Sequence, residues 1–460
     1  MKKKMMATVL GISMLAAAFA GCGSSTSTDS STAASSQAAV SGETVAAAET
    51  AAETGDSTAI AESSDGAKKL VFWDKAEYVD EYATKMKETV DKFAEENNVE
   101  VDYVNVAASD MKQKLMAAIE AGTAPDLIVG DNTLVGQFGS MNQLADVTDV
   151  VDSIDFTDSA KEIGKFGDTQ YMVPQAFTAP GVYIRKDKWE AAGFDMPTTW
   201  EELKTQAETV NDPANGFYAL GFAMGASGGG DAEGFVRTII LDWGGQTVDE
   251  NGNVTVNSPE TVSAFEFIKS LYDEGLISQD AVTGDDSWNN QAYLAGTAGV
   301  ICNSGSVIAS LKSDNPDLLA NTQVIAYPAG PEGTYTLGGS NVFGIIASGA
   351  NVDTAKEFVK YYFSDIDNYE AMIEIMGGMW QPVVNGLDDT DFWQDPDMKP
   401  WLESSKQTVS TYYPAPTDDR AMTGFSNQLC VKAVQEMLVN GTSPEDAVAD
   451  LETSFKELYE

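Results

Sequence analysis

The sequence predicts an α/β protein with two lobes. Strand-like and helix-like segments alternate between residues 68 and 129, an order that produces a parallel sheet with helices on its faces. The 394 residues from 67 to 460 exceed what one compact core accommodates and fit two. An apolar content of 43% and eight Trp indicate that this part is globular. No repeat of solenoid or propeller length interrupts it.

The first elements follow from hydrophobic periodicity. Residues 68–73 (KKLVFW) read as a strand, and apolar residues spaced by three or four over 79–93 predict an amphipathic helix. Residues 99–106 (VEVDYVNV) predict a second strand. A helix capped by Ser109 and ended by Gly122 precedes a short apolar strand at 127–129.

Later helices carry start signals of the usual kinds. These are a capping box, Ser-Pro pairs and an acidic cap, at Thr199 with Glu202, Ser258-Pro259, Ser443-Pro444 and Asp353. They predict helices that begin directly after each of these residues.

The amino terminus has the layout of a secretory signal. Three Lys precede a short apolar run that ends at Ala20-Gly21-Cys22. A Cys directly after such a cleavage site is the pattern of a bacterial lipoprotein, so we expect residues 1–21 to be removed and Cys22 to be lipidated. Residues 22–66 contain no aromatic residue and no Lys or Arg, and this composition predicts a disordered tether.

Composition excludes several classes of function. A net charge of −44 disfavours nucleic acid and anionic membrane surfaces as partners. The absence of His removes Ser/His/Asp and Cys/His catalysis and most zinc sites. Cys302 and Cys430 form no metal motif, and we expect each to be a small buried residue, although a bridge between them stays open.

Four segments, in this order, resemble one bacterial family. They read AGTAPDLIVGDN (121–132), DTQYMVPQAFTAPGVYIRKDKWEAAGFDMPTTWEEL (168–203), YLAGTAGVICNSGS (293–306) and LGGSNVFGIIASGANVDTAKEFVKYYFS (337–364). The set is similar to bacterial extracellular solute-binding protein family 1, which includes maltose- and multiple-sugar-binding lipoproteins of ABC-type importers.

The resemblance implies an α/β, two-lobed, periplasmic-binding-protein-like fold of type II. Each lobe would hold a mixed sheet flanked by helices, with a hinge between the lobes. We assign 67–176 and 322–368 to the amino-terminal lobe, and 177–321 and 369–460 to the carboxyl-terminal lobe.

Candidate ligand-binding residues follow from the chemistry of a neutral sugar. Carboxylates, amides and guanidinium groups can hydrogen-bond adjacent hydroxyls, and aromatic rings cover patches of C–H surface. The candidates lie where loops leave predicted strands or contain glycines. They are Trp380 as the first choice, with Trp73, Asp74, Glu77, Asp131, Asn132, Gln175, Tyr218, Trp243, Asn303, Ser304, Ser340, Asn341, Arg420, and Tyr412 or its neighbour Tyr413.

The implied function is capture of a neutral carbohydrate, with an oligosaccharide favoured, in the cleft between lobes. Hinge closure would present the loaded protein to ABC-importer permease subunits. We expect no catalysis, no cofactor, no metal and a monomer, lipid-anchored on the outer face of the cell membrane. Two alternatives stay open: the same fold binding a polyamine or an iron complex, and a secreted carbohydrate-active enzyme using two carboxylates.

Overall fold

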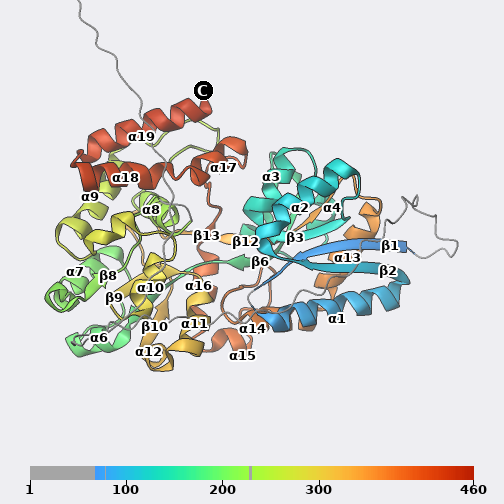
Figure 1. The fold of residues 1–460 in the computed structure, drawn as a ribbon, viewed down its shortest axis with the longest axis horizontal. Helices are drawn as coiled ribbons and strands as arrows, with labels where there is room; N and C mark the ends of the chain where they lie inside the picture. Colours follow the sequence, from blue (N-terminus) through green and yellow to red (C-terminus); the bar gives the residue numbers. More distant parts are fainter. Residues whose placement is uncertain (1–67, 78, 227–229) are drawn as a thin grey trace, which may run out of the picture. The chain divides into compact units, whose positions relative to one another are not determined.

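The computed structural model describes residues 68–77, 79–226 and 230–460. The signal segment, Cys22 and the tether lie outside the described residues. Figure 1 shows helices packed on two separate sheets, an α/β arrangement. Within the described ranges, no helix combines the length and apolar character needed to cross a membrane.

The first sheet has five strands in the order β2-β1-β3-β12-β6. Its strands are β1 (Lys68–Lys75), β2 (Val99–Val106), β3 (Leu127–Asp131), β6 (Met172–Thr178) and β12 (Gly339–Ile345). β1 runs parallel to both β2 and β3, which confirms the parallel pairing expected from the strand-helix alternation. β12 enters antiparallel between β3 and β6, so the sheet is mixed.

Helices cover both faces of this sheet because successive residues of a strand point to opposite faces. Phe72 packs in one core cluster with α1 (Asp80–Asn97) and α13 (Val352–Ser364). Its neighbour Trp73 packs in another cluster with α2 (Ala108–Ala121) and α3 (Asn132–Ser140). The amphipathic helix predicted over 79–93 is therefore confirmed as α1.

The second sheet has four strands in the order β10-β7-β9-β8. They are β7 (Gly181–Arg185), β8 (Tyr218–Leu220), β9 (Ala298–Asn303) and β10 (Thr322–Ile325). β9 is parallel to β8 and antiparallel to β7, so this sheet is mixed too. Because β10 pairs with β7, we propose that the chain returns to the first lobe after residue 325, rather than at the predicted boundary of 322.

Helices also pack on both faces of the second sheet. One core cluster joins Val182, Ile184 and Val300 to side chains of six helices. The helices with residues in this cluster are α6 (Lys186–Ala192), α7 (Trp200–Val210), α8 (Asp231–Asp242), α9 (Pro259–Asp273), α18 (Leu429–Asn440) and α19 (Pro444–Tyr459). Tyr183 and Ile301 belong instead to the cluster that contains residues of α11 (Ser306–Asp314) and α16 (Lys399–Lys406).

The remaining elements connect these layers. The helices are α4 (Thr148–Val151), α5 (Asp158–Lys161), α10 (Trp288–Leu294), α11 (Ser306–Asp314), α12 (Pro316–Ala320), α14 (Ile366–Met376), α15 (Asp391–Gln394), α16 (Lys399–Lys406) and α17 (Asp419–Ser426). Two short ladders pair β4 (Lys165–Phe166) with β5 (Thr169–Gln170), and β11 (Thr336–Leu337) with β13 (Thr408–Val409). Two 3₁₀ turns occupy Pro213–Asn215 and Gln279–Thr283.

Three of the predicted helix caps are confirmed. Thr199, Ser258 and Ser443 each accept a backbone N–H three residues later, at 3.1, 3.2 and 3.1 Å.

Two predicted caps were wrong. α2 begins before Ser109, after an Ala107 that makes no side-chain cap. α13 begins at Val352 after Asn351, so Asp353 lies in its first turn. Its start is fixed by a tertiary contact, since the Asn351 N–H donates to the Asp126 carboxylate at 2.7 Å, and no local pattern carries that information.

The two cysteines of the folded part are buried and unpaired, which confirms the prediction of small buried residues. Cys302 lies in β9 and Cys430 in α18.

Candidate functional site

Most candidates from the amino-terminal part gather at one edge of the first sheet. β1 and β3 both end there, and Asn341 at the start of β12 lies opposite Asp131 on β3 and Ala176 on β6. This register brings together eight of the predicted residues: Trp73, Asp74, Glu77, Asp131, Asn132, Gln175, Ser340 and Asn341. Ligands of open α/β sheets bind at this kind of edge.

Asp74 and Gln175 lie beneath this edge rather than on it, since both are fully buried. The Asp74 carboxylate accepts hydrogen bonds from the hydroxyls of Tyr103, at 2.7 Å, and Tyr82, at 3.4 Å. Gln175 donates to the Tyr82 hydroxyl at 3.1 Å. Burial raises the pKa of Asp74 to about 7, with the nearby Glu77 raising it further and the tyrosine hydrogen bonds opposing. In this structure, neither side chain presents an oxygen to a solute.

Two other acids at the edge are also held by protein partners. The Glu77 carboxylate pairs with the Lys75 ammonium and accepts from the Asn341 amide, both at 2.9 Å. Asp131 caps α3 by accepting the Leu134 N–H at 2.8 Å. The carboxylates that we predicted to bind hydroxyls therefore stabilise the edge of the sheet itself.

Asn132 and Ser340 do face an open space. They line a cavity of about 510 Å³ between the sheet edge and residues 408–422. The Asn132 side-chain oxygen accepts the Ser340 N–H at 3.3 Å, which joins α3 to β12 at the cavity wall. Among the described residues, the Ser340 hydroxyl is buried and has no hydrogen-bond partner, so it can bind a group that enters the cavity.

Three aromatic rings line the same cavity: Phe177, Tyr412 and Tyr413. Tyr412 is 3% exposed and its hydroxyl lies 3.5 Å from that of Thr133, a contact between the segment after β13 and α3. Tyr413 is 40% exposed, with its ring centroid 5.7 Å from that of Tyr335. The cavity therefore combines ring surface with uncharged hydrogen-bonding groups.

Charged groups of the lining are mostly acidic. Glu162, Asp168 and Glu250 contribute carboxylates, and Lys165 contributes one ammonium, which lies 3.4 Å from Glu162. This balance disfavours an anionic solute.

Phe177 was not among the predicted site residues, and neither was the β4–β5 hairpin, which supplies Lys165 and Gly167 to the cavity wall. A signal for the hairpin was present in GKFGDTQ, because Gly164 and Gly167 both take positive φ values, +78° and +62°, and Gly tolerates that conformation. Phe177 carried no signal, since it reads as one more apolar residue of a buried strand.

The candidates of the second sheet are divided between its two ends. Asn303 and Ser304 lie at the carboxyl end of β9. The Asn303 amide donates to Asp231 at 3.0 Å, and the Asn289 amide donates to the same oxygen at 2.9 Å. Burial, and secondarily the neighbouring Asp286, raise the pKa of Asp231 to about 7. Asn303 and Ser304 thus belong to a polar cluster at the start of α8.

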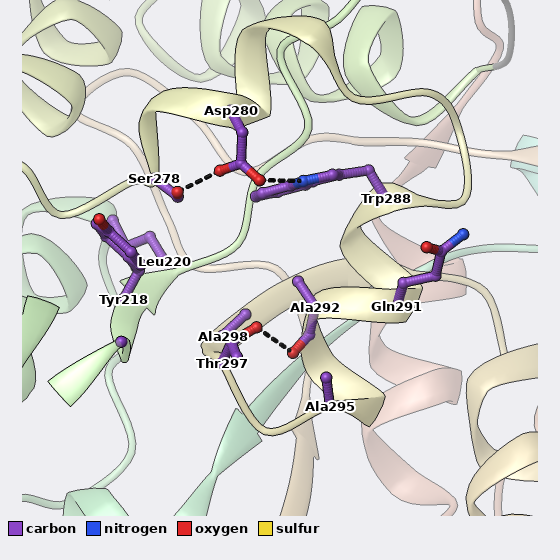
Figure 2. A pocket seen from close by; sticks show the side chains of 11 residues that line it. Tyr218, Leu220, Ser278, Asp280, Trp288, Gln291, Ala292, Ala295, Thr297 and Ala298 are labelled. Atoms are coloured by element: carbon purple, nitrogen blue, oxygen red, sulfur yellow. Dashed lines mark hydrogen bonds between the residues drawn. The ribbon is translucent and has the colours of Figure 1, made fainter. Parts of the chain in front are cut away.

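Tyr218 lies at the opposite end of the second sheet, where β8 and β9 begin. It lines a separate pocket of about 440 Å³ that also contains Trp288 and Asp280 (Figure 2). In this register Tyr218 and Asn303 lie at opposite edges of the second sheet, because Tyr218 begins β8 beside the first residue of β9 and Asn303 is the last residue of β9.

Trp243 and Arg420 line neither space among the described residues. Trp243 ends α8, is 8% exposed, and packs on Phe267 with ring centroids 4.4 Å apart. Arg420 pairs with Asp418 at 2.6 Å and lies over the Tyr459 ring at 4.6 Å. Their contacts are those of a packed ring and a surface ion pair.

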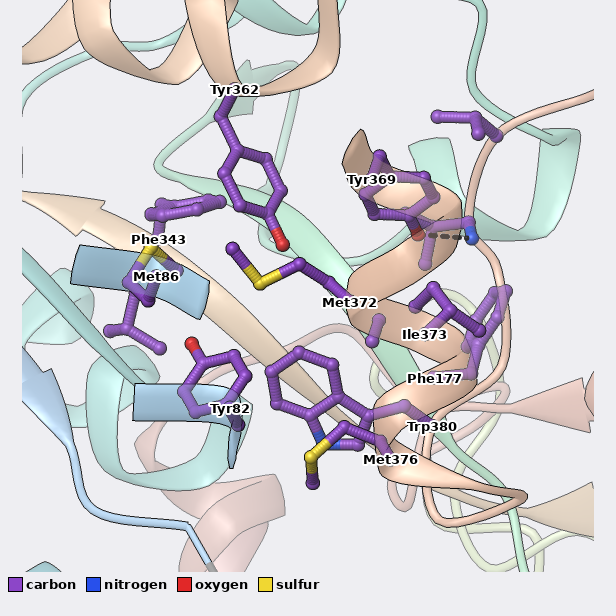
Figure 3. Packing of buried hydrophobic residues seen from close by; sticks show 14 of the residues in the cluster. Tyr82, Met86, Phe177, Phe343, Tyr362, Tyr369, Met372, Ile373, Met376 and Trp380 are labelled. Atoms are coloured by element: carbon purple, nitrogen blue, oxygen red, sulfur yellow. Dashed lines mark hydrogen bonds between the residues drawn. The ribbon is translucent and has the colours of Figure 1, made fainter. Parts of the chain in front are cut away.

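Trp380, the first choice among the aromatic candidates, is a core residue in this structure. It is 1% exposed and packs edge-on against Tyr82, with ring centroids 4.8 Å apart. Figure 3 shows its indole beside Tyr82, Met372 and Met376. The flanking glycines suggested an open loop, but the next turn folds onto the first sheet because Gln381 and Phe177 exchange two backbone hydrogen bonds.

Comparison with known proteins identifies a family. The model of the bacterial extracellular solute-binding proteins matches residues 75–368. The maltotriose-binding protein of Pyrococcus abyssi is 25% identical over 304 residues, which cover 65% of this chain and 63% of that protein. The chain thus spans less than two thirds of the length of this relative.

Solved structures share the fold over nearly their whole length. The cyclic alpha-maltosyl-1,6-maltose binding protein from Arthrobacter globiformis has a TM-score of 0.73 at 20% identity, covering 86% of this chain and 99% of that one. A solute-binding protein of an ABC transporter from Thermotoga lettingae, bound with alpha-D-tagatose, has a TM-score of 0.68 at 18% identity, covering 86% and 100%. These likenesses confirm the predicted fold class. Together with the family match over residues 75–368, the motifs and the paired sheets show that this chain belongs to the bacterial extracellular solute-binding proteins.

Proposed function

We propose that the protein captures a neutral carbohydrate in the 510 Å³ cavity and delivers it to the membrane permease of an ABC importer. The observation that carries this proposal is the lining, which sets the rings of Phe177, Tyr412 and Tyr413 beside the Asn132 amide and the unpaired Ser340 hydroxyl. Rings stack on the C–H faces of a sugar, and the amide and hydroxyl bind its hydroxyls. Several relatives are named for binding maltotriose or related oligosaccharides, so an oligosaccharide is the preferred ligand.

The proposal includes a lipid anchor on the outer face of the membrane. Its support is the order Lys2-Lys3-Lys4, apolar run, Ala20-Gly21-Cys22 in the sequence. Residues 22–66 would link the anchored cysteine to the folded body, which would act as a monomer without a catalytic step or cofactor.

A polyamine is the second candidate ligand. Glu162, Asp168 and Glu250 line the cavity against one ammonium, that of Lys165. A cationic solute would gain from this excess of carboxylates, so amines belong in the first screen.

A thermal-shift screen tests the proposal, because a ligand that binds only the folded state raises the melting temperature. The screen includes maltose, maltotriose and cellobiose, with spermidine and ferric citrate as the alternatives. We expect one or more sugars to shift the transition. A shift by spermidine or ferric citrate alone would overturn the sugar assignment, and release of a shorter glycan would show an enzyme instead.

The site is then checked with Tyr413→Ala. Loss of this exposed ring should weaken the sugar found in the screen about tenfold, which corresponds to about 1.4 kcal/mol, as measured by calorimetry. Tyr361→Ala is the matched control, because Tyr361 lies on α13 with its hydroxyl on Glu96 and lines no part of the cavity. Equal affinities of the two variants would exclude this cavity as the site.

A further inference from the structure

The pocket at the amino end of β8 and β9 has a lining of its own. It measures about 440 Å³ and shares no residue with the larger cavity. The residues that carry its chemistry are Tyr218, Ser278, Asp280, Trp288, Gln291 and Thr297. A volume of this size falls within the range of small-molecule sites, about 300–1,000 Å³.

One wall of the pocket is a tryptophan held in a fixed orientation. The Trp288 indole N–H donates to the Asp280 carboxylate at 3.2 Å, and the Ser278 hydroxyl donates to the same carboxylate. Behind the ring, the backbone of Gly284 lies so close that a Cβ there would sit 2.5 Å from Trp288 Cγ. The indole is therefore positioned before any ligand arrives, which lowers the entropy cost of binding.

Small side chains face this ring across the pocket. Figure 2 shows the Trp288 indole on one side and Ala292, Thr297 and Ala298 on the other, with Tyr218 at one end and Gln291 at the other. A flat apolar face opposite short side chains leaves room for a ring of the ligand to stack on the indole.

Polar groups stand at the ends of this slot. The side-chain amide of Gln291 donates to the Ser287 hydroxyl at 2.7 Å, and the Thr297 hydroxyl donates to the Ala292 carbonyl at 3.0 Å. The side-chain oxygens of Gln291 and Thr297 can therefore still accept hydrogen bonds. Within the described part of the chain, the Tyr218 hydroxyl has no hydrogen-bond partner. These groups can accept from and donate to hydroxyls at the edge of a stacked ring.

The charge of the lining selects a neutral ligand. The hydrogen bonds that Asp280 accepts from Ser278 and Trp288 lower its pKa. The Asp280 carboxylate is therefore ionised at neutral pH. Because no Lys or Arg of the described ranges lines this pocket, an anion would meet only repulsion there. A free amine would have to compete with the two donors that already hold Asp280.

We propose that this pocket is a second carbohydrate site, in which one pyranose ring of a neutral sugar stacks on Trp288. Its lining is independent of the larger cavity, while its use in sugar uptake rests on the proposed function. Tyr218 pairs with Ala298 at the first residue of β9, and Asn303 is the last. Five steps along a strand separate the two ends by about 16 Å, so the pocket opens away from the edge that carries Asn303.

The experiment follows the indole N–H signals of ¹⁵N-labelled protein. The sequence holds eight Trp, and the Trp288→Phe variant identifies the signal of Trp288. The probes are the methyl glycosides of glucose, galactose and mannose, with putrescine and glucose 6-phosphate as the competing chemistries. We expect a saturable shift of the Trp288 signal with at least one methyl glycoside. No shift with any glycoside, or a shift with putrescine or the phosphate alone, would overturn the proposal.

Two variants test the pocket further. Gln291→Ala removes an exposed side chain and should weaken the glycoside about three- to tenfold, as expected for one hydrogen bond. Tyr413→Ala should leave the Trp288 titration unchanged. If Tyr413→Ala abolished the Trp288 shift, the signal would report binding at the larger cavity and the second site would be excluded.

The two proposals can fail separately. Equal affinities of Tyr413→Ala and Tyr361→Ala for the sugar remove the larger cavity as its site, whereas the Trp288 signal reads the smaller pocket directly. A glycoside titration at Trp288 that persists in the Tyr413→Ala protein supports the second site whatever the outcome at the first.

Discussion

The Asp74 carboxyl of the first sheet is fully buried and accepts hydrogen bonds from two tyrosine hydroxyls. Burial raises the pKa of Asp74 to about 7, and it raises the pKa values of Asp231 and Asp242 to about 7 as well. An unfolded Asp titrates near pH 3.9. Between about pH 4 and 7 these three carboxyls therefore bind more protons in the folded chain than in the unfolded chain, and their contribution to the free energy of unfolding falls as the pH rises through that window.

This difference predicts a pH dependence that Asp74→Asn should reduce. The sequence has no His, so no imidazole titration overlaps the window. We expect the melting temperature of the wild type to fall from pH 5.5 to 8, and that of Asp74→Asn to fall less. Asp102→Asn, which changes an exposed acid on β2, should follow the wild type. An Asp74→Asn curve as steep as that of the wild type would contradict the prediction.

The same residues show what a sequence reveals about a site. That Asp74 and Asp131 meet at one edge was predictable, because the carboxyl ends of neighbouring parallel strands share an edge. Asn341 joins them because β12 begins at that edge and runs antiparallel to β3. Whether a side chain at that edge faces a cavity or the core depends on partners from distant segments. Tyr103 and Tyr82 cover Asp74, and Tyr82 also packs on Trp380. The sequence around Asp74 or Trp380 does not indicate these contacts.

At the scale of elements, α8 is tied to α18 by a buried acid. The Glu233 carboxylate accepts from the Arg237 guanidinium at 2.8 Å and from the N–H groups of Cys430 and Val431 at 3.3 and 2.9 Å. Glu233 is 0% and Arg237 5% exposed. The Arg237 guanidinium also lies over the rings of Phe425 and Phe455, which belong to α17 and α19. Glu233 therefore connects α8 to its own next turn and to the start of α18.

Glu233→Gln should destabilise the protein strongly, because it leaves a buried guanidinium without a counter-charge. Removing one partner of a buried pair costs about 3–5 kcal/mol, measured here as the free energy of unfolding in urea. Glu266→Gln on α9 is the control, since Glu266 is exposed, and it should change stability by less than about 0.5 kcal/mol. Similar losses in both variants would show that the pair contributes little.

Element prediction succeeded where the determining contacts are local. Thr199, Ser258 and Ser443 cap the helices they were predicted to cap because each bond spans only three residues. The start of α13 could not be predicted, since it depends on Asp126, 225 positions away in the sequence. The pairing of β10 with β7 was not predictable either, because a segment of four residues carries little information about its partner strand.

At the scale of the whole molecule, the two sheets are joined by several crossings of the chain. The chain passes from β6 to β7 through residues 179 and 180, and returns between β10 and β12. Gln381 links the first crossing to a later segment, because its side-chain oxygen accepts the Ala179 N–H at 2.8 Å and its amide donates to the Gly378 carbonyl at 2.6 Å. Short crossings of this kind can act as a hinge.

A ligand that contacts both the edge of the first sheet and residues 408–422 across the 510 Å³ cavity should shift the protein toward a closed state. We expect the radius of gyration, measured by small-angle scattering, to fall when the sugar identified by thermal shift is added. Tyr413→Ala should require about tenfold more sugar for the same change, matching its loss of affinity. A radius of gyration that stays constant at saturating sugar would contradict closure.

The reactivity of Cys302 and Cys430 reports local unfolding of the folded body. Both thiols lie in the hydrophobic cluster around the second sheet, and burial raises the pKa of Cys302 to about 12 and that of Cys430 as well. Since only an exposed thiolate reacts readily, alkylating reagents can modify these two residues only while that cluster is open. Their rate of alkylation therefore measures how often the second sheet and its helices separate, in a chain that needs no introduced label.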